Sequence, residues 1–222
     1  MPFTTIFCDL DDTLYPSGNG LWEAIGQRMN RFMVERVKLP EDQVPSIRRH
    51  YYQTYGTTLR GLQIHHAVAA DEYLAYVHDL DLEQFLHPDA CLRDMLFNLP
   101  QKIWIFTNAD AAHAGRVVAV LGLENCFEGI IDVRSIQFAC KPENLAYERA
   151  LALAGNPLPA QCILLDDSAV NLVPAFDMGL STVWINQNGS SHPSAVHTLS
   201  KLIDLRDVMP ELWGLNIKQA GI

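Results

Sequence analysis

The stretch Asp9-Leu10-Asp11-Asp12-Thr13 decides the fold of this chain, because it places three carboxylates directly after the apolar run 6–8. If that run is a strand of a parallel sheet, Asp9 and Asp11 lie at the carboxyl edge of the sheet, where ligands bind. Like charges at such an edge repel one another unless a cation or a shared proton relieves them. An acidic, solvated turn is the alternative interpretation of these residues taken alone.

A hydroxyl, an amide and a lysine follow in two later segments. The apolar run 103–106 ends in Thr107 and Asn108, just before a predicted helix over 110–121. Backbone amides at a helix start favour an anion, and both side chains can add donors to a phosphate oxygen. Helix capping is the alternative for Thr107 and Asn108. In the second segment, Lys141 precedes Pro142, which can open a helix running to about residue 153. An ordinary surface lysine is the alternative for Lys141.

A second acid pair closes the series. The apolar run 163–165 ends in Asp166 and Asp167, and Asn171 stands one helical turn beyond Asp167. Taken singly, this pair also fits a helix cap. The four motifs follow one another in the chain as acid pair, hydroxyl, lysine and acid pair. Each lies near the end of a predicted strand or the start of a helix, so chance is a poor explanation of this order.

This ordering resembles the haloacid dehalogenase superfamily of phosphohydrolases, and the resemblance covers the chain from residue 3 to about residue 185. Within that superfamily the chain is most similar to the pyrimidine 5′-nucleotidase-like group. The segments that carry this similarity are 9–16, 51–62, 106–109 and 165–168. The resemblance implies a doubly wound α/β core and an enzyme that hydrolyses phosphoric monoesters.

The resemblance also implies roles for the residues that match the motifs. Asp9 would be the nucleophile that becomes an aspartyl phosphate, and Asp11 would protonate the leaving alkoxide and later activate water. Holding that proton requires a raised pKa, and crowding beside other carboxylates acts in that direction. Thr107, Asn108 and Lys141 would hold the phosphate, with Thr107 and Lys141 also counted as catalytic.

A Mg²⁺ cofactor is implied as well, since Mg²⁺ prefers a few carboxylates together with water and substrate phosphate. The implied ligands all come from the two acid pairs: Asp9, the backbone carbonyl of Asp11, Asp167 and Asp166. Asp166 either ligates directly or orients water. Asp12 is expected to support the turn, and Asn171 stands where related sequences often have an aspartate.

Strand-like and helical segments alternate in the pattern of a doubly wound parallel sheet. The expected strands are 4–8, 102–106, 129–133, 162–165 and 182–185. Roughly 100 residues separate Asp9 from Thr107, whereas one βαβ unit needs about 30. The surplus predicts a small helical cap over 17–87, inserted into a core formed by 1–16 and 88–222. Its expected helices are 21–37, 41–55 and 71–78.

The cap is expected to select the substrate. The aromatic rings and hydrogen-bond donors of the cap are most concentrated at five residues: Tyr51, Tyr55, Thr57, Thr58 and Arg60. Ordinary core packing is the alternative explanation for these tyrosines. Nucleoside 5′-monophosphates, pyrimidine ones favoured, are the expected substrates. The alternatives are phosphatases of sugar phosphate, phosphoglycolate, pyridoxal phosphate or lysophosphatidate, a phosphomutase, and an inactive binding module.

Composition limits the partners. The 222 residues carry a net charge of −10 with a pI near 5.1, which disfavours nucleic-acid polymers and anionic membranes. A small phosphorylated metabolite is the expected partner of a monomer or homodimer. The five cysteines lack paired spacing, and no apolar run approaches the ~18 residues of a membrane span, so we expect a cytoplasmic protein. Trp213 and Leu215 could pack on the core or on another subunit.

Overall fold

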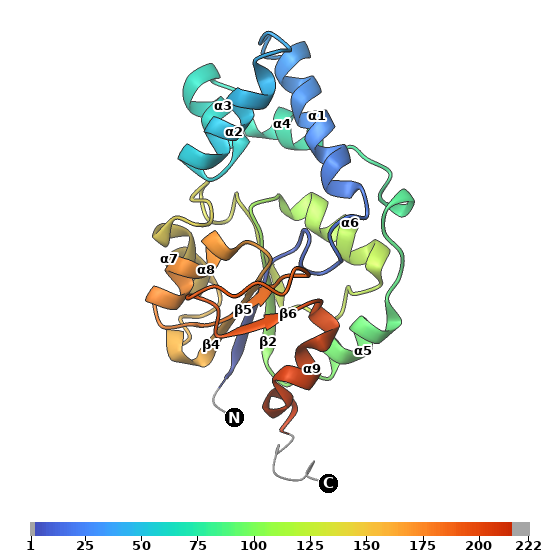
Figure 1. Ribbon diagram of the computed structural model, residues 1–222, viewed down its shortest axis with the longest axis vertical. Helices are drawn as coiled ribbons and strands as arrows, with labels where there is room; N and C mark the ends of the chain where they lie inside the picture. Colours follow the sequence, from blue (N-terminus) through green and yellow to red (C-terminus); the bar gives the residue numbers. More distant parts are fainter. Residues whose placement is uncertain (1–2, 215–222) are drawn as a thin grey trace.

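The computed structural model describes residues 3–214. Its centre is a six-stranded sheet in which every neighbouring pair is parallel, in the order β3-β2-β1-β4-β5-β6 (Figure 1). The strands are β1 (Thr5–Cys8), β2 (Lys102–Phe106), β3 (Gly129–Ile131), β4 (Cys162–Asp166), β5 (Ser181–Ile185) and β6 (His197–Leu199). The strand order reverses at β1, and the carboxyl ends beside such a switch point form a binding crevice. The doubly wound α/β prediction is confirmed.

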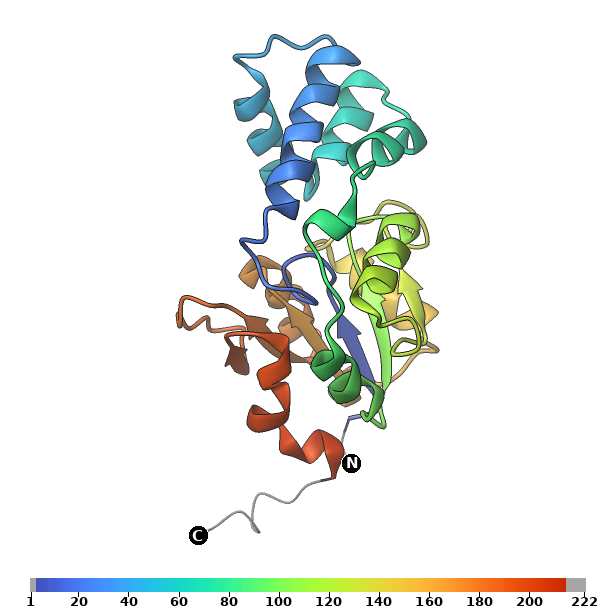
Figure 2. The same cartoon turned by 90° about the vertical axis from the view of Figure 1, so that its right-hand side faces the viewer.

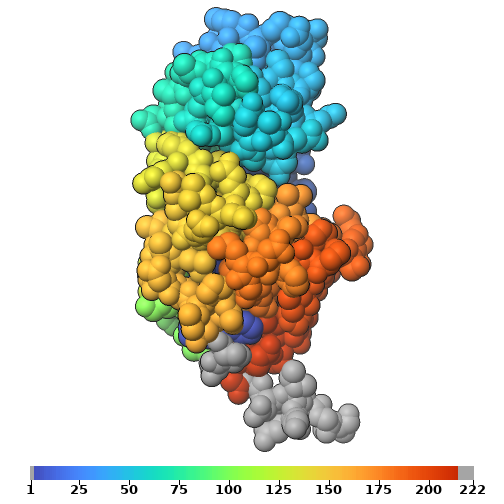
Figure 3. All heavy atoms as spheres, turned by 90° about the vertical axis from the view of Figure 1, so that its left-hand side faces the viewer, coloured from blue at the N-terminus to red at the C-terminus, as the bar shows by residue number. Residues whose placement is uncertain are grey.

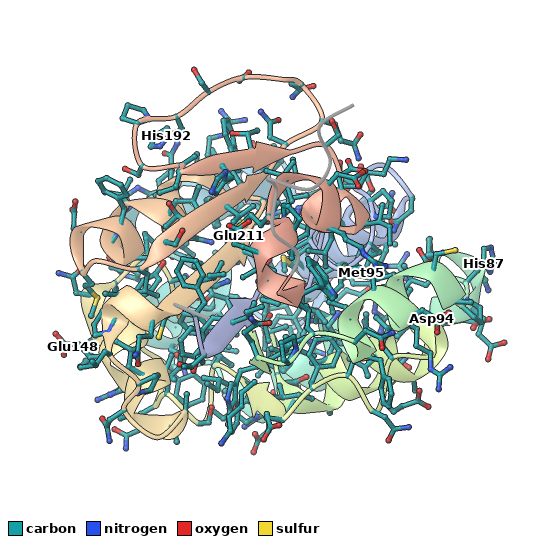
Figure 4. The ribbon with its side chains drawn as sticks, turned by 90° about the horizontal axis from the view of Figure 1, so that it is seen from below. His87, Asp94, Met95, Glu148, His192 and Glu211 are labelled. Atoms are coloured by element: carbon teal, nitrogen blue, oxygen red, sulfur yellow. The ribbon has the colours of Figure 1, made fainter. Side chains whose placement is uncertain are left out.

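Helices cover both faces of the sheet, as Figure 4 shows from below, where Glu148 of α7 lies on one side and Asp94 and Met95 of α5 on the other. One layer holds α5 (Ala90–Phe97), α6 (Ala111–Leu121) and α9 (Leu205–Val208), and the other holds α7 (Asn144–Leu153) and α8 (Ala169–Asp177). Alternate residues of β1 serve the two layers. Ile6 and Cys8 join the first core cluster, and Phe7 joins the second, as period-two geometry requires.

Four helices form a separate bundle above the sheet, connected to it by two segments of the chain (Figure 2). They are α1 (Leu21–Glu35), α2 (Val44–Tyr55), α3 (Thr58–His66) and α4 (Ala70–Val77). The bundle has its own apolar core, in which Phe32 packs edge-on against Tyr73 with ring centroids 5.1 Å apart. The bundle occupies the segment over which the sequence predicts a cap, but no helix was predicted at the position of α3.

The cap rests on the loop that carries Lys141, and Figure 3 shows the two surfaces in contact. Gly56 ends α2 in the left-handed region at φ 79°, and an added Cβ would lie 3.1 Å from the Lys141 carbonyl oxygen. The next residue, Thr57, places its Oγ1 3.6 Å from Cys140 Sγ. At this close approach only glycine fits without strain, because it lacks a Cβ and tolerates positive φ.

The remaining elements are short. The part of the chain that the structure describes holds four 3₁₀ helices, at Leu82–Gln84, Pro159–Gln161, Leu202–Asp204 and Pro210–Trp213. Strand β6 was not predicted, because its three residues carry no pattern that separates them from the preceding loop. Trp213 packs against the core of its own chain, and Leu215 lies outside the described residues. None of the helices within 3–214 is long and apolar enough to cross a membrane.

Candidate active site

The functional side chains meet because the ends of neighbouring parallel strands meet. The Asp9 amide donates to the Leu165 carbonyl at 2.9 Å, and the Thr107 amide donates to the Ile131 carbonyl at 3.0 Å. These bonds continue the sheet beyond β1 and β2 and fix the backbone at both positions. Asp9 and Thr107 therefore open into one cavity, which the cap covers.

Lys141 lies at the centre of this site. Its Nζ donates to Asp9 Oδ1 at 2.8 Å and to Asp166 Oδ2 at 2.7 Å, and its side chain is 1% exposed. Burial lowers the pKa of Lys141, but the carboxylates of Asp166 and Asp9 raise it by more, so the net direction is upward. The ammonium stays charged beside two carboxylates. The surface-lysine alternative is wrong.

Asn108 fixes the main chain of Lys141 rather than capping a helix. Its Oδ1 accepts from the Lys141 amide at 2.8 Å, and its Nδ2 donates to the Lys141 carbonyl at 3.0 Å. Thr107 Oγ1 accepts from the Ala109 amide at 3.0 Å, while Asp110 is the residue that caps α6. The two side chains thus shape the loop, and both line the cavity.

The second acid pair divides into two environments. Asp166 is fully buried, and both of its oxygens are engaged: Oδ2 by Lys141, and Oδ1 by the Ser168 amide and Asn171 Nδ2, each at 2.9 Å. The carboxylate of Asp167 has no hydrogen bond within residues 3–214, although its amide donates to Thr13 at 3.1 Å. Of these two aspartates, Asp167 is the one with both carboxylate oxygens available for a new ligand.

The charges of this acid cluster are poorly neutralised. Burial raises the pKa of Asp167 to about 8, with Asp9 and Asp166 adding to the shift. Burial likewise raises the pKa of Asp9 to about 7, against the opposing effect of Lys141. One lysine cannot offset three adjacent carboxylates, so a further cation would relieve the remaining repulsion.

The donor set fits a hard divalent cation. Asp9, Asp166 and Asp167 each offer an oxygen, and these three oxygens lie within 4.8 Å of one another. Oxygen ligands of this kind are what Mg²⁺ prefers. The contacts of Asp166 with Lys141 favour the alternative in which it orients the site, and Asp9 and Asp167 are the better candidates for direct ligands.

The environment of Asp11 differs from the expectation. Asp11 Oδ1 accepts from the Tyr15 hydroxyl at 2.5 Å and lies 3.2 Å from His113 Nε2. Burial raises the pKa of Asp11, but the hydrogen bonds and charge of His113, with the Tyr15 bond, lower it by more. The predicted rise in the pKa of Asp11 is wrong for this arrangement. The neighbour that crowding does affect is Asp12, whose pKa rises to about 6 through burial and the charge of Asp11.

Two histidines of the site were not predicted from the sequence. His113 is 1% exposed on α6, and His78 at the end of α4 stacks on it with ring centroids 4.1 Å apart. Eight scattered histidines without ligand spacing carry no signal for such a pair. The available clue was the position of His113 in the first turn after Thr107 and Asn108.

The cavity extends from the acid cluster into the cap and has a volume of about 690 Å³. Of the five cap residues that the sequence predicts for substrate selection, Thr57 and Thr58 line the cavity. The other three, Tyr51, Tyr55 and Arg60, do not line it. The Tyr51 hydroxyl instead lies 2.9 Å from His66 Nε2, and the Tyr55 hydroxyl 2.7 Å from His65 Nε2. The cap residues that do face the cavity include Trp22, Asn30, Arg48, Arg49 and Tyr52.

With this geometry established, comparison with known proteins identifies the family. The model of the haloacid dehalogenase-like hydrolases matches residues 3–179. The chain belongs to that family. This hydrolase is also 31% identical over 194 residues to "Phosphate metabolism protein 8" of Saccharomyces cerevisiae. The aligned region covers 80% of this chain and 60% of that protein. The chain thus spans about three fifths of the length of this curated relative.

Solved structures share the fold of this hydrolase at low identity. A HAD phosphatase from Thermococcus onnurineus matches with a TM-score of 0.63 at 18% identity, over 93% of this chain and 98% of that one. The HAD-hydrolase YfnB from Bacillus subtilis, bound to magnesium, gives 0.61 at 15%, over 94% and 99%. L-2-haloacid dehalogenase from Xanthobacter autotrophicus gives 0.60 at 14%, over 94% and 98%. At these identities the likeness concerns the fold.

Proposed function

We propose that this hydrolase is a Mg²⁺-dependent phosphomonoesterase that forms an aspartyl phosphate on Asp9 and acts on nucleoside 5′-monophosphates, with pyrimidine nucleotides favoured. The observation that carries the proposal is the position of Lys141 Nζ, 2.8 Å from Asp9 and 2.7 Å from Asp166, beside the unpartnered carboxylate of Asp167. A nucleophilic carboxylate next to a buried ammonium and a cation-binding acid cluster suits the transfer of a dianionic group.

The residues of the chain supply the steps of a double displacement. Asp11 must first take up a proton from solvent, because its contacts with His113 and Tyr15 lower its pKa in the ligand-free protein by more than burial raises it. An Asp9 oxygen then attacks phosphorus, the ester P–O bond breaks, and Asp11 gives that proton to the leaving alkoxide. Water then attacks the phosphorus of the aspartyl phosphate, Asp11 accepts its proton, and the carboxylate of Asp9 is restored. Lys141 offsets the charge on Asp9 and on the transferring group. When bound, Mg²⁺ would add to this neutralisation.

The acid cluster also favours phosphate over a halogenated acid as substrate. Halide departs without a proton, so a dehalogenase needs neither a proton donor at Asp11 nor a cation site. In this chain Asp11 is held in the cavity by two hydrogen-bond partners. Asp167 adds a carboxylate whose charge a bound cation would relieve.

The nucleotide preference draws support from the cap side of the cavity. Trp22 and Tyr52 line it and are 44% and 55% exposed, which leaves aromatic faces open for stacking a base. Arg48 is held by the Gly26 carbonyl at 2.8 Å and by Asn30 at 2.9 Å. Arg49 is exposed and has no hydrogen bond or ion pair within the described residues, so its five donors are free for a ligand.

The decisive experiment measures phosphate release with and without EDTA from UMP, CMP, AMP, phosphoglycolate, pyridoxal phosphate and lysophosphatidate. The proposal expects the highest kcat/KM with UMP or CMP and full loss of turnover in EDTA, restored by Mg²⁺. Undiminished turnover after dialysis against EDTA would refute the metal requirement. A clear preference for a substrate without a base would refute the nucleotide assignment and leave the phosphatase assignment intact.

A matched pair of arginine variants tests the cap. Arg49→Ala should raise KM for UMP by roughly 10-fold, about the value of one charged hydrogen bond, and should leave KM for p-nitrophenyl phosphate within about twofold because that substrate is too short to reach it. Arg60→Ala is the control, since Arg60 does not line the cavity. Equal effects of both variants on UMP would contradict the assignment of Arg49.

A further inference from the structure

Two buried side chains that contact Asp11 have no role in the proposed chemistry so far. Both hydrogen-bond partners of Asp11, the Tyr15 hydroxyl and His113 Nε2, contact the same oxygen, Oδ1. Tyr15 is 3% exposed and His113 is 1% exposed, so neither side chain is free to rotate into solvent. Asp11 itself lines the cavity, and its Oδ2 has no hydrogen-bond partner within residues 3–214.

The fold fixes the ring of His113 from its own helix. The His113 amide donates to Asp110 Oδ1 at 2.8 Å, and the Ala111 amide donates to Asp132 Oδ2 at 3.0 Å. Two carboxylates therefore hold the first turn of α6, where unpaired amides would otherwise remain. The imidazole projects from a turn whose backbone cannot shift without breaking these bonds.

The cap adds the second support. His78 stacks on His113 at 4.1 Å with an interplanar angle of 15°, and it is 8% exposed. Its carbonyl accepts from Arg116 Nη1 at 2.9 Å, and the Leu80 carbonyl accepts from Arg116 Nη2. Arg116 lies on the same helix as His113. The chain leaving the cap is thus attached to α6 where the imidazole meets Asp11.

We propose that His113 is a positioning residue for Asp11, backed by His78, and that together with Tyr15 it holds Oδ1 so that Oδ2 faces the leaving-group oxygen. The inference rests on the proposed phosphomonoesterase function. Each carboxylate has two oxygens, and a proton donor is effective only within hydrogen-bond distance of the group that it protonates. Loss of an outer hydrogen-bond partner of a metal-ligating residue typically costs 10–100-fold in activity, and we expect the same scale for the partner of a proton donor.

The test compares two substrates of similar size that differ in their need for a proton. The leaving group of benzyl phosphate is a basic alkoxide, which needs a proton from a general acid. The leaving group of p-nitrophenyl phosphate is a stabilised phenolate, which needs little protonation. With the full chain in excess over substrate and Mg²⁺ present, the single-turnover rate of alcohol release reports the first step alone. We expect His113→Leu to lower this rate by about 10–100-fold for benzyl phosphate and by less than about threefold for p-nitrophenyl phosphate.

Further variants separate positioning from folding. His113→Gln keeps a donor near the position of Nε2 and should recover most of the rate with benzyl phosphate. His78→Ala should lower the rate with benzyl phosphate by a smaller factor than His113→Leu does, with the same substrate dependence. His78→Phe keeps a stacked ring and should lose less than His78→Ala. Equal losses on both substrates, or full activity of His113→Leu with benzyl phosphate, would overturn the inference. A wild-type protein that releases phosphate from neither substrate nor from UMP would overturn the proposed function and this inference with it.

Discussion

The two adjacent aspartates at the end of β4 should respond to the same substitution with opposite changes in stability. Asp166→Asn removes one of the two carboxylates that pair with the buried Lys141, which retains Asp9 at 2.8 Å. Breaking a buried ion pair from one side costs about 3–5 kcal/mol, and the remaining partner reduces this to about 3 kcal/mol by the same reasoning. For a chain of this size we expect Tm to fall by about 6–12 °C.

Asp167→Asn should instead stabilise the metal-free protein. Burial and the charges of Asp9 and Asp166 raise the pKa of Asp167 to about 8, so its ionised form is unfavourable in the folded state. Because Asp167 can take up a proton instead, its cost to the stability of the folded state is at most about 4 kcal/mol at pH 7. Partial solvent access reduces this cost to about 1–2 kcal/mol. Removing the charge should therefore raise Tm by about 2–8 °C in EDTA.

The assay is thermal unfolding of both variants and of wild type, in EDTA and in a Mg²⁺ series at pH 7. Mg²⁺ should raise the Tm of wild type through binding to the native state, should act at higher concentration on Asp166→Asn, and should have little effect on Asp167→Asn. If Asp167→Asn lowers Tm in EDTA, or if it responds to Mg²⁺ as wild type does, the assignment of Asp167 as the ligand and of Asp166 as the partner of Lys141 is wrong.

Three further outcomes are expected. Asp9→Asn should abolish turnover, and a base-labile phosphoryl adduct should be trapped on wild type alone; an adduct elsewhere would exclude Asp9 as nucleophile. Gly61→Ala should lower the free energy of unfolding by about 1–3 kcal/mol, because the added Cβ would lie 2.2 Å from Tyr51 Cγ. Gly115 has open space around it, so Gly115→Ala should raise the free energy of unfolding by about 0.5–1 kcal/mol. Denaturant unfolding that ranks the two variants in the opposite order would contradict this packing. In EDTA, Tm should fall as the pH rises from about 6 to about 8.5. The raised pKa values of Asp9 and Asp167 mean that in this range the folded state holds protons that the unfolded chain has lost. Mg²⁺ should then raise Tm more at the higher pH, and a pH-independent effect of Mg²⁺ would count against these two ligands.

Local sequence patterns were sufficient for the framework of this protein. Buried parallel strands read as short apolar runs, and polar residues directly after them must lie at one edge of the sheet. For that reason the amino-acid sequence by itself predicts that Asp9, Thr107, Asp166 and Asp167 share one site. The excess length between Asp9 and Thr107 in turn required an inserted helical unit.

Contacts between distant segments were decided only by the tertiary structure. Nothing local distinguishes Asp166 from Asp167, and their separate roles arise because Lys141, 25 residues earlier in the chain, reaches only one of them. His113 and Asp11 lie 102 residues apart, and the pKa of Asp11 follows from that approach rather than from the neighbouring acids. The cap behaves likewise, since the packing of α2 against α3 turns Tyr51 and Tyr55 toward histidines and leaves Tyr52 facing the cavity. Sequence spacing fixes which residues share a helix face, but only the docking of one face against another decides which face meets the substrate.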